Sequence, residues 1–165
     1  MSKTRGLKVE DIETLKWLNV SEGYKVPPNK VVAVHAFQML CPGCVMHGVP
    51  QANKLSQIFN SDLVQVLGLH TVFEHHEAMQ EPSLRAFLHE FRVRFPVGID
   101  VPQTDDRIPR SMRKFSLQGT PSWLLFNRKG ELAAHLFGQV EDLVVASMIT
   151  QLVYEDALSE TPLLK

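Results

Sequence analysis

The feature that most constrains this chain is Cys41-Pro42-Gly43-Cys44, which comes shortly after an apolar run over residues 31–37. That run is rich in β-branched residues, apolar on both faces and free of proline, which is typical of a strand in the middle of a parallel sheet. A helical pattern follows over about residues 42–60. The order predicts that Cys41 lies where a helix begins, and unpaired backbone N–H groups and the helix dipole favour a negatively charged sulfur there.

This placement predicts thiol–disulfide exchange. The thiolate is the nucleophile, so a site that stabilises it at Cys41 can attack a disulfide. Cys44, one helical turn further on, can then resolve the mixed disulfide. Pro42 suits the first helical position because its missing N–H would be unpaired there in any case.

Two other interpretations of the cysteine pair stay open. A zinc site usually needs four nitrogen or sulfur ligands, and the chain has no cysteines besides Cys41 and Cys44. His47 and His35 are the nearest substitute ligands, and His35 lies inside the apolar run. The second interpretation is a purely structural pair of buried cysteines.

Length and composition indicate one globular domain. The chain has 165 residues, of which 44% are hydrophobic and 21% are charged, which is enough for a sizeable core. The formal net charge of −1 gives no electrostatic case for binding nucleic acid or an anionic membrane surface. No apolar stretch follows the first residues, so we expect no signal peptide, no membrane span and a cytoplasmic protein, in which a disulfide between the two cysteines is transient.

The pattern along the chain predicts an α/β fold. We expect a single domain over residues 1–165, with an N-terminal extension over 1–30 that holds a short edge strand, and a core over 31–154. Proline at position 50 predicts a kink early in the first helix. The expected strands cover 17–20, 31–38, 63–69, 95–100, 123–126 and 132–137, and the expected helices cover 42–60, 82–91, 111–116 and 141–154.

A second motif, Gly119-Thr120-Pro121, comes just before the predicted C-terminal hairpin. Together with the strand, Cys41-Pro42-Gly43-Cys44 and the helix, it makes the chain resemble the thioredoxin superfamily, and within it the TlpA-like (redoxin) thiol–disulfide oxidoreductases. Residues 119–132 look like the cis-proline strand, turn and final strand of that branch, and residues 67–75 look like one of its strands with the following loop. The resemblance covers about residues 31–154.

The resemblance implies a thioredoxin-like fold, with a central mixed sheet flanked by helices and a C-terminal β-hairpin and helix. It implies that Cys41 attacks and Cys44 resolves. It also implies that Thr120–Pro121 is a cis peptide against the sulfurs, whose backbone pairs with an extended substrate. The expected partners are a protein or small-molecule disulfide or thiol and a cellular reductant, with no cofactor and no metal.

Departures from the family pattern leave the proton-transfer group open. Thioredoxin has a buried aspartate on the strand before its first cysteine, and the matching residue here is His35. The TlpA-like branch often has a glutamate three residues after its second cysteine, and here that residue is His47. His47 is the preferred candidate because it lies near the helix start, and His35 is the alternative, since an imidazole titrates near neutral pH.

Two rival functions are weighed against the exchange reaction. A peroxiredoxin-like peroxidase carries Pro-x-x-x-Thr/Ser-x-x-Cys, but the matching positions are Val34 and Gln38 before Cys41, and residues 37 and 41 before Cys44, so neither cysteine fits. The other rival is a non-catalytic thioredoxin-fold module that binds a partner, copper or zinc. Four further histidines fit no standard metal spacing, and we interpret them as residues of a polar loop: His70, His75, His76 and His89.

Overall fold

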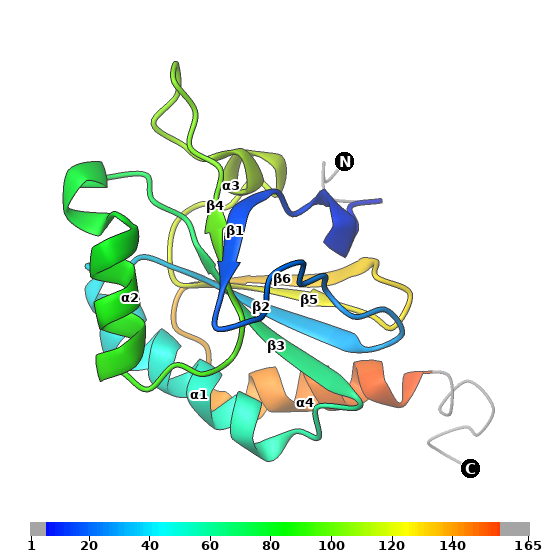
Figure 1. Cartoon of the computed structure of the whole chain (residues 1–165). Coiled ribbons are helices and arrows are strands. Elements are labelled where there is room, and N and C mark those ends of the chain that lie inside the picture. Colours follow the sequence, from blue (N-terminus) through cyan, green and yellow to red (C-terminus); the bar gives the residue numbers. More distant parts are fainter. Residues whose placement is uncertain (1–5, 156–165) are drawn as a thin grey trace, which may run out of the picture.

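A computed structural model describes residues 6–155, and its centre is a six-stranded sheet in the order β1-β4-β3-β2-β5-β6 (Figure 1). The strands are β1 Thr14–Leu18, β2 Val31–Phe37, β3 Val64–His70, β4 Val97–Asp100, β5 Ser122–Phe126 and β6 Leu132–Phe137. The α-helices are α1 Val49–Ile58, α2 Glu81–Glu90, α3 Arg110–Lys114 and α4 Asp142–Val153. Three shorter helical segments are η1 Val9–Asp11, η2 Cys44–Gly48 and η3 His76–Met79.

The pairing of the strands makes the sheet mixed. β2 pairs in parallel with β3 and antiparallel with β5, and β4 continues the parallel part beside β3. β6 and β1 close the two edges in antiparallel pairs with β5 and β4. The predicted α/β architecture, with helices flanking a central mixed sheet and a C-terminal hairpin and helix, is confirmed.

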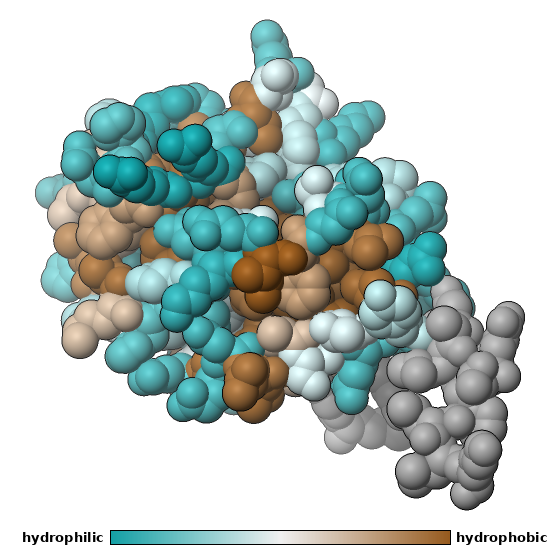
Figure 2. Space-filling model, turned by 90° about the horizontal axis from the view of Figure 1, so that it is seen from below, coloured by the Kyte–Doolittle hydropathy of each residue, from teal (hydrophilic) through white to brown (hydrophobic). Residues whose placement is uncertain are grey.

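The side chains of β2 alternate between two cores, as the period of two residues in a strand requires. Val31, Ala33 and Phe37 pack with α1, α2 and α4, whereas Val32, Val34 and Ala36 pack with α3 and the N-terminal segment. His35 falls in the first set by position, so it faces the layer that contains α1. Figure 2 shows the molecule from below, where apolar patches lie between hydrophilic ones.

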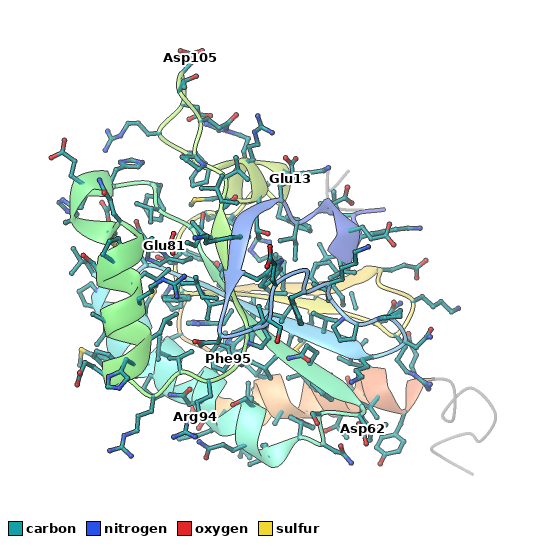
Figure 3. All side chains as sticks on the ribbon, in the orientation of Figure 1. Glu13, Asp62, Glu81, Arg94, Phe95 and Asp105 are labelled. Carbon is teal, nitrogen blue, oxygen red and sulfur yellow. The ribbon has the colours of Figure 1, made fainter. Side chains whose placement is uncertain are left out.

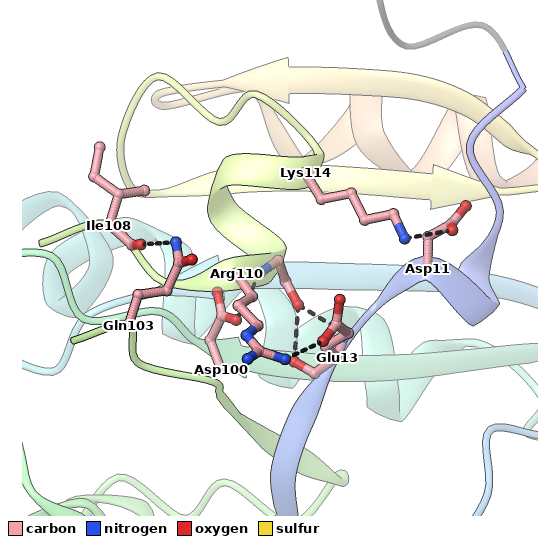
Figure 4. A network of polar contacts seen from close by, with 8 residues as sticks. Asp11, Glu13, Asp100, Gln103, Ile108, Arg110 and Lys114 are labelled. Carbon is pink, nitrogen blue, oxygen red and sulfur yellow. Dashed lines mark hydrogen bonds and ion pairs between the residues drawn. The ribbon is translucent and has the colours of Figure 1, made fainter. Parts of the chain in front are cut away.

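The N-terminal segment is fixed to α3 by polar contacts (Figure 4). Lys114 pairs with Asp11 at 2.8 Å, and Arg110 pairs with Glu13 at 3.2 Å. The Ser111 hydroxyl also donates to the carbonyl oxygen of Glu13 at 2.8 Å. These contacts hold the segment that leads into β1, the edge strand of the sheet.

Two strands differ from the predicted bounds by more than one residue at an end. The edge strand lies at Thr14–Leu18, earlier than the expected residues 17–20, because Asn19 has a left-handed φ of 61° that ends it. β4 begins at Val97 and leaves out Phe95 and Pro96. The division into one domain over 1–165 stays a prediction, and its ends at 1–5 and 156–165 lie outside the described residues.

Candidate active site

The cysteine pair lies in a tight turn between β2 and the first helical segment. Cys41 N–H donates to the carbonyl oxygen of Gln38 at 3.1 Å, and Val45 N–H donates to that of Cys41 at 3.0 Å, so the helix starts at the first cysteine. Both cysteines are free thiols. Cys44 N–H donates to Cys41 Sγ at 3.4 Å, so a backbone donor at the helix start points at this sulfur, as the sequence predicts.

The helix after the turn is wider than the expected kinked α-helix. Residues Cys44–Gly48 form one π-helical turn, in which Val49 N–H donates to the carbonyl oxygen of Cys44. Regular α1 begins only at Val49. Pro50 lacks an N–H and cannot donate to a carbonyl four residues earlier, so the chain changes its hydrogen-bonding pattern just before it.

The two sulfurs differ in their surroundings. Cys41 is partly exposed, whereas Cys44 is fully buried. Burial and, to a smaller extent, the hydrogen bond with Cys41 raise the pKa of the Cys44 thiol to about 12. Because the thiolate is the attacking species, this asymmetry makes Cys41 the sulfur that an incoming disulfide can reach and Cys44 an internal thiol.

The loop before β5 lies against the turn. The Thr120–Pro121 peptide bond is cis, and the Cys41 thiol donates to the carbonyl oxygen of Thr120 at 3.4 Å. A Cβ atom placed on Gly43 would be 3.3 Å from Pro121 Cδ, so the proline ring packs directly on the turn. The Thr120 hydroxyl oxygen is buried with no hydrogen-bond partner. Thr120, Pro121 and the cysteines therefore form one site.

His35 lies beneath this site. Its side chain is fully buried, and neither ring nitrogen has a hydrogen-bond partner. The ring stacks on Phe37 with centroids 5.6 Å apart and packs on Trp123 at 5.1 Å. Burial lowers the pKa of His35 to about 3, so the imidazole is neutral.

Gly48 gives His35 its room, and sequence reasoning missed this residue. A Cβ atom on Gly48 would be 2.3 Å from His35 Nε2 and 3.1 Å from Pro121 Cβ. The imidazole therefore touches the helix at a position four residues, or about one turn, after Cys44. The signal in the sequence is a glycine inside a helical pattern, which often indicates close packing.

His47, the preferred proton-transfer candidate, is placed differently. It lies in the π-helical turn with its side chain exposed, and it has no hydrogen bond or ion pair with another residue of the described part. The structure thus brings together Cys41, Cys44, Thr120 and Pro121, and it leaves His47 at the surface beside them.

The other histidines are not all loop residues. His70 is the last residue of β3 and is buried, so its assignment to a polar loop is wrong, while His89 lies exposed on α2. The strand expected to end at residue 69 continues through His70. Within residues 6–155, no three histidine, cysteine, aspartate or glutamate side chains are grouped to hold a metal ion.

Comparisons with solved structures extend these observations. A crystal structure of a thioredoxin-like superfamily protein is 47% identical, covers 90% of this chain and 97% of its own, and gives a TM-score of 0.84. A thiol-disulfide isomerase from Corynebacterium glutamicum is 43% identical, with 86% and 93% covered and a TM-score of 0.81. A protein assigned as thiol:disulfide interchange protein DsbE from Chlorobium tepidum shares the fold at 19% identity, with 76% and 81% covered and a TM-score of 0.60.

Other comparisons add little. No family model and no curated protein matches the sequence. In the described part of the chain, none of the helices has the length and apolar character needed to cross a membrane.

Proposed function

The chain belongs to the thioredoxin superfamily, alongside thiol–disulfide oxidoreductases that include the TlpA-like (redoxin) type, and on that premise we propose that Cys41 and Cys44 exchange a dithiol for a disulfide with a protein substrate. The observation that carries the proposal is the asymmetry of the pair. Cys41 is partly exposed and accepts the Cys44 N–H at 3.4 Å, whereas Cys44 is buried behind it.

The proposed reaction has two displacements. The Cys41 thiolate attacks one sulfur of a substrate disulfide, forms a mixed disulfide and releases the other sulfur as a thiolate. Cys44 then loses its proton and attacks Cys41 Sγ, which closes the Cys41–Cys44 disulfide and releases the second substrate sulfur. Two electrons pass to the substrate, and a cellular reductant restores the dithiol.

The loop with Thr120 and Pro121 supports substrate positioning. In the free protein the carbonyl oxygen of Thr120 is occupied by the Cys41 thiol at 3.4 Å. Once Cys41 is in a mixed disulfide it has no S–H, so this carbonyl becomes free to accept a backbone N–H from an extended substrate segment. The same contact would then orient the mixed disulfide for attack by Cys44.

Proton transfer from Cys44 is the second requirement, since burial holds the pKa of this thiol near 12. We propose that His35 takes the proton, because its unpartnered ring lies against the helix one turn after Cys44. A thiolate forming nearby stabilises an imidazolium that burial alone disfavours. His47, exposed on the same turn, stays the alternative proton acceptor.

The cytoplasmic location stays a prediction. In that compartment thiols are kept reduced, so the Cys41–Cys44 disulfide would be a transient stage of the cycle. The direction of exchange with any substrate follows from the difference between the two reduction potentials.

The first test is the reduction of insulin by dithiothreitol, with wild type, Cys41→Ala, Cys44→Ala and the exposed control Ser147→Ala. We expect Cys41→Ala to fall to the uncatalysed rate, because it lacks the attacking sulfur. Cys44→Ala should accumulate a mixed disulfide and lose turnover, and Ser147→Ala should match wild type. Activity of Cys41→Ala equal to wild type would exclude the proposal. Efficient consumption of a hydroperoxide by wild type would favour the hypothesis of a peroxiredoxin-like peroxidase.

The second test separates the two histidines. His35→Phe keeps an aromatic ring beside Phe37 but removes the ring nitrogens and adds one ring atom, and His47→Ala removes the exposed imidazole. With a preformed mixed disulfide on Cys41, we expect the rate of closure by Cys44 to fall at least tenfold at neutral pH in His35→Phe and to stay within twofold in His47→Ala. The opposite pattern would assign proton transfer to His47.

A further inference from the structure

A hollow lies at the carboxyl ends of β3 and β4, where open α/β sheets tend to bind ligands. Its volume is about 310 Å³. Because a water molecule occupies roughly 30 Å³, the hollow has room for about ten water molecules. Most of its wall is apolar and comes from β1, β4, α2 and the segment after β3: Leu15, Val72, Met79, Leu84 and Ile99.

His70 supplies a polar group in this wall. The side chain is 1% exposed, and Nε2 accepts the backbone N–H of Met39 at 3.3 Å. Burial lowers the pKa of His70 to about 4, so the ring is neutral. A neutral imidazole with an accepting Nε2 carries its proton on Nδ1. Nδ1 has no hydrogen bond to another described residue, so one donor is left for a ligand.

The charged groups around the hollow argue against an anionic ligand. Glu81 lies at the start of α2 near the edge strand (Figure 3), and its carboxylate pairs with Lys16 at 2.9 Å and Arg85 at 2.8 Å. Asp100 accepts hydrogen bonds from Thr71 Oγ1, Ser111 N and Met112 N. Both carboxylates are satisfied by the protein, and a ligand carboxylate would lose its hydration against the mostly apolar wall. A cation would find no carboxylate oxygen left unpaired at Glu81 or Asp100.

We propose that this hollow is a binding site for a compact, uncharged, largely apolar molecule with one hydrogen-bond acceptor, such as an aryl ketone, whose oxygen accepts the His70 Nδ1 proton. Apolar walls supply most of the binding energy, and the hydrogen bond from His70 fixes the orientation. The site does not depend on the exchange reaction. It does touch the redox turn, because Met39, the backbone donor to His70, lies two residues before Cys41.

Three probes of similar size test the proposal by NMR titration of the reduced full chain: acetophenone, ethylbenzene, which lacks the acceptor, and benzoate, which is charged. We expect saturable shifts at the Met39 amide and at the methyl groups of Val72 and Ile99 with acetophenone. A neutral hydrogen bond contributes about 0.5–1.5 kcal/mol, so ethylbenzene should bind about 2- to 13-fold more weakly. Benzoate should bind most weakly of the three.

Leu15→Trp places a larger side chain at the rim of the hollow. Its control is Leu143→Trp, at an exposed position of α4. We expect Leu15→Trp to weaken acetophenone binding at least fivefold, and Leu143→Trp to leave it unchanged. The absence of saturable shifts with acetophenone, equal binding of ethylbenzene, tighter binding of benzoate, or unchanged binding in Leu15→Trp would each overturn the proposal. The result is independent of the insulin assay, so failure of one does not imply failure of the other.

Discussion

Two buried titratable side chains in the same sheet have opposite surroundings. Asp100, at the end of β4, is 3% exposed and accepts three hydrogen bonds, from Ser111 N at 2.8 Å, Met112 N at 3.0 Å and Thr71 Oγ1 at 2.9 Å. His35, on β2, is 0% exposed and accepts or donates none. Asp100 accepts hydrogen bonds from backbone N–H groups in the first turn of α3 and so anchors this helix to the sheet, whereas His35 lies under the cysteine turn.

The difference separates a structural group from a candidate functional one. A buried polar group usually has its partners, and one without them calls for an explanation. At Asp100 the carboxylate oxygens satisfy backbone donors at the helix start, which explains why it is there. At His35 no hydrogen bond uses the ring nitrogens. The ring packs against Gly48, which lies four residues after Cys44, and against Trp123, which lies on β5 just after Pro121.

The largest effect on the free energy of unfolding is expected at Asp100. Asp100→Ala leaves two backbone N–H groups and one hydroxyl buried without an acceptor, and each such group costs about 1–3 kcal/mol. We expect the free energy of unfolding to fall by about 4 kcal/mol in urea denaturation, with Asp100→Asn losing less. Insulin reduction per folded molecule should stay at the wild-type level. A loss below 1 kcal/mol would mean that these bonds do not anchor α3.

A smaller effect is expected at Gly48. Gly48→Ala places a Cβ atom 2.3 Å from His35 Nε2, so the ring or the helix must move, and overpacking of a core costs about 1–3 kcal/mol. The control is Gly43→Ala, whose Cβ atom would be 3.3 Å from Pro121 Cδ and whose helical φ of −62° suits alanine. We expect about 2 kcal/mol of destabilisation in the first variant and less than 1 kcal/mol in the second. Equal losses would show that His35 is not packed on this turn.

The smallest effect on stability at neutral pH is expected for His35→Phe. Removing two buried, unpartnered nitrogens is favourable and offsets most of the cost of a ring that is one atom larger, so the free energy of unfolding should stay within about 1 kcal/mol of wild type. At acidic pH the stabilities of wild type and His35→Phe are expected to differ. The pKa of His35 is about 3 in the folded state and 6.5 in the reference state, so the unfolded chain binds the extra proton between these values and wild type loses stability as the pH falls below 6.5.

The expected difference is a slope of about 1.4 kcal/mol per pH unit between pH 6 and pH 4, present in wild type and absent from His35→Phe. His70, with a pKa of about 4 for the same reason, gives both proteins a further loss of the same sign. Urea denaturation over this pH range measures the slopes. Parallel curves would show that His35 is hydrated or partnered in solution.

The sequence predicts the parts of this site that follow from chain order. The strand over 31–37 and the helix start at Cys41 come from an apolar run and a short motif, and both are where expected. The sequence predicts the π-helical turn only in part, because Pro50 indicates that the helix is disturbed but not which hydrogen-bonding pattern results. The missing partners of His35 and the burial of His70 arise from contacts between distant segments, which the pattern around each histidine does not contain.

The relative alkylation rates of the two cysteines in the reduced protein show which sulfur is the attacking one. Short pulses of iodoacetamide at neutral pH, followed by peptide mass spectrometry, give the rate at each sulfur. We expect rapid modification of Cys41 and protection of Cys44, because Cys44 is fully buried and its thiol pKa is near 12. Modification of Cys44 as fast as, or faster than, Cys41 would contradict the assignment of Cys41 as the attacking sulfur.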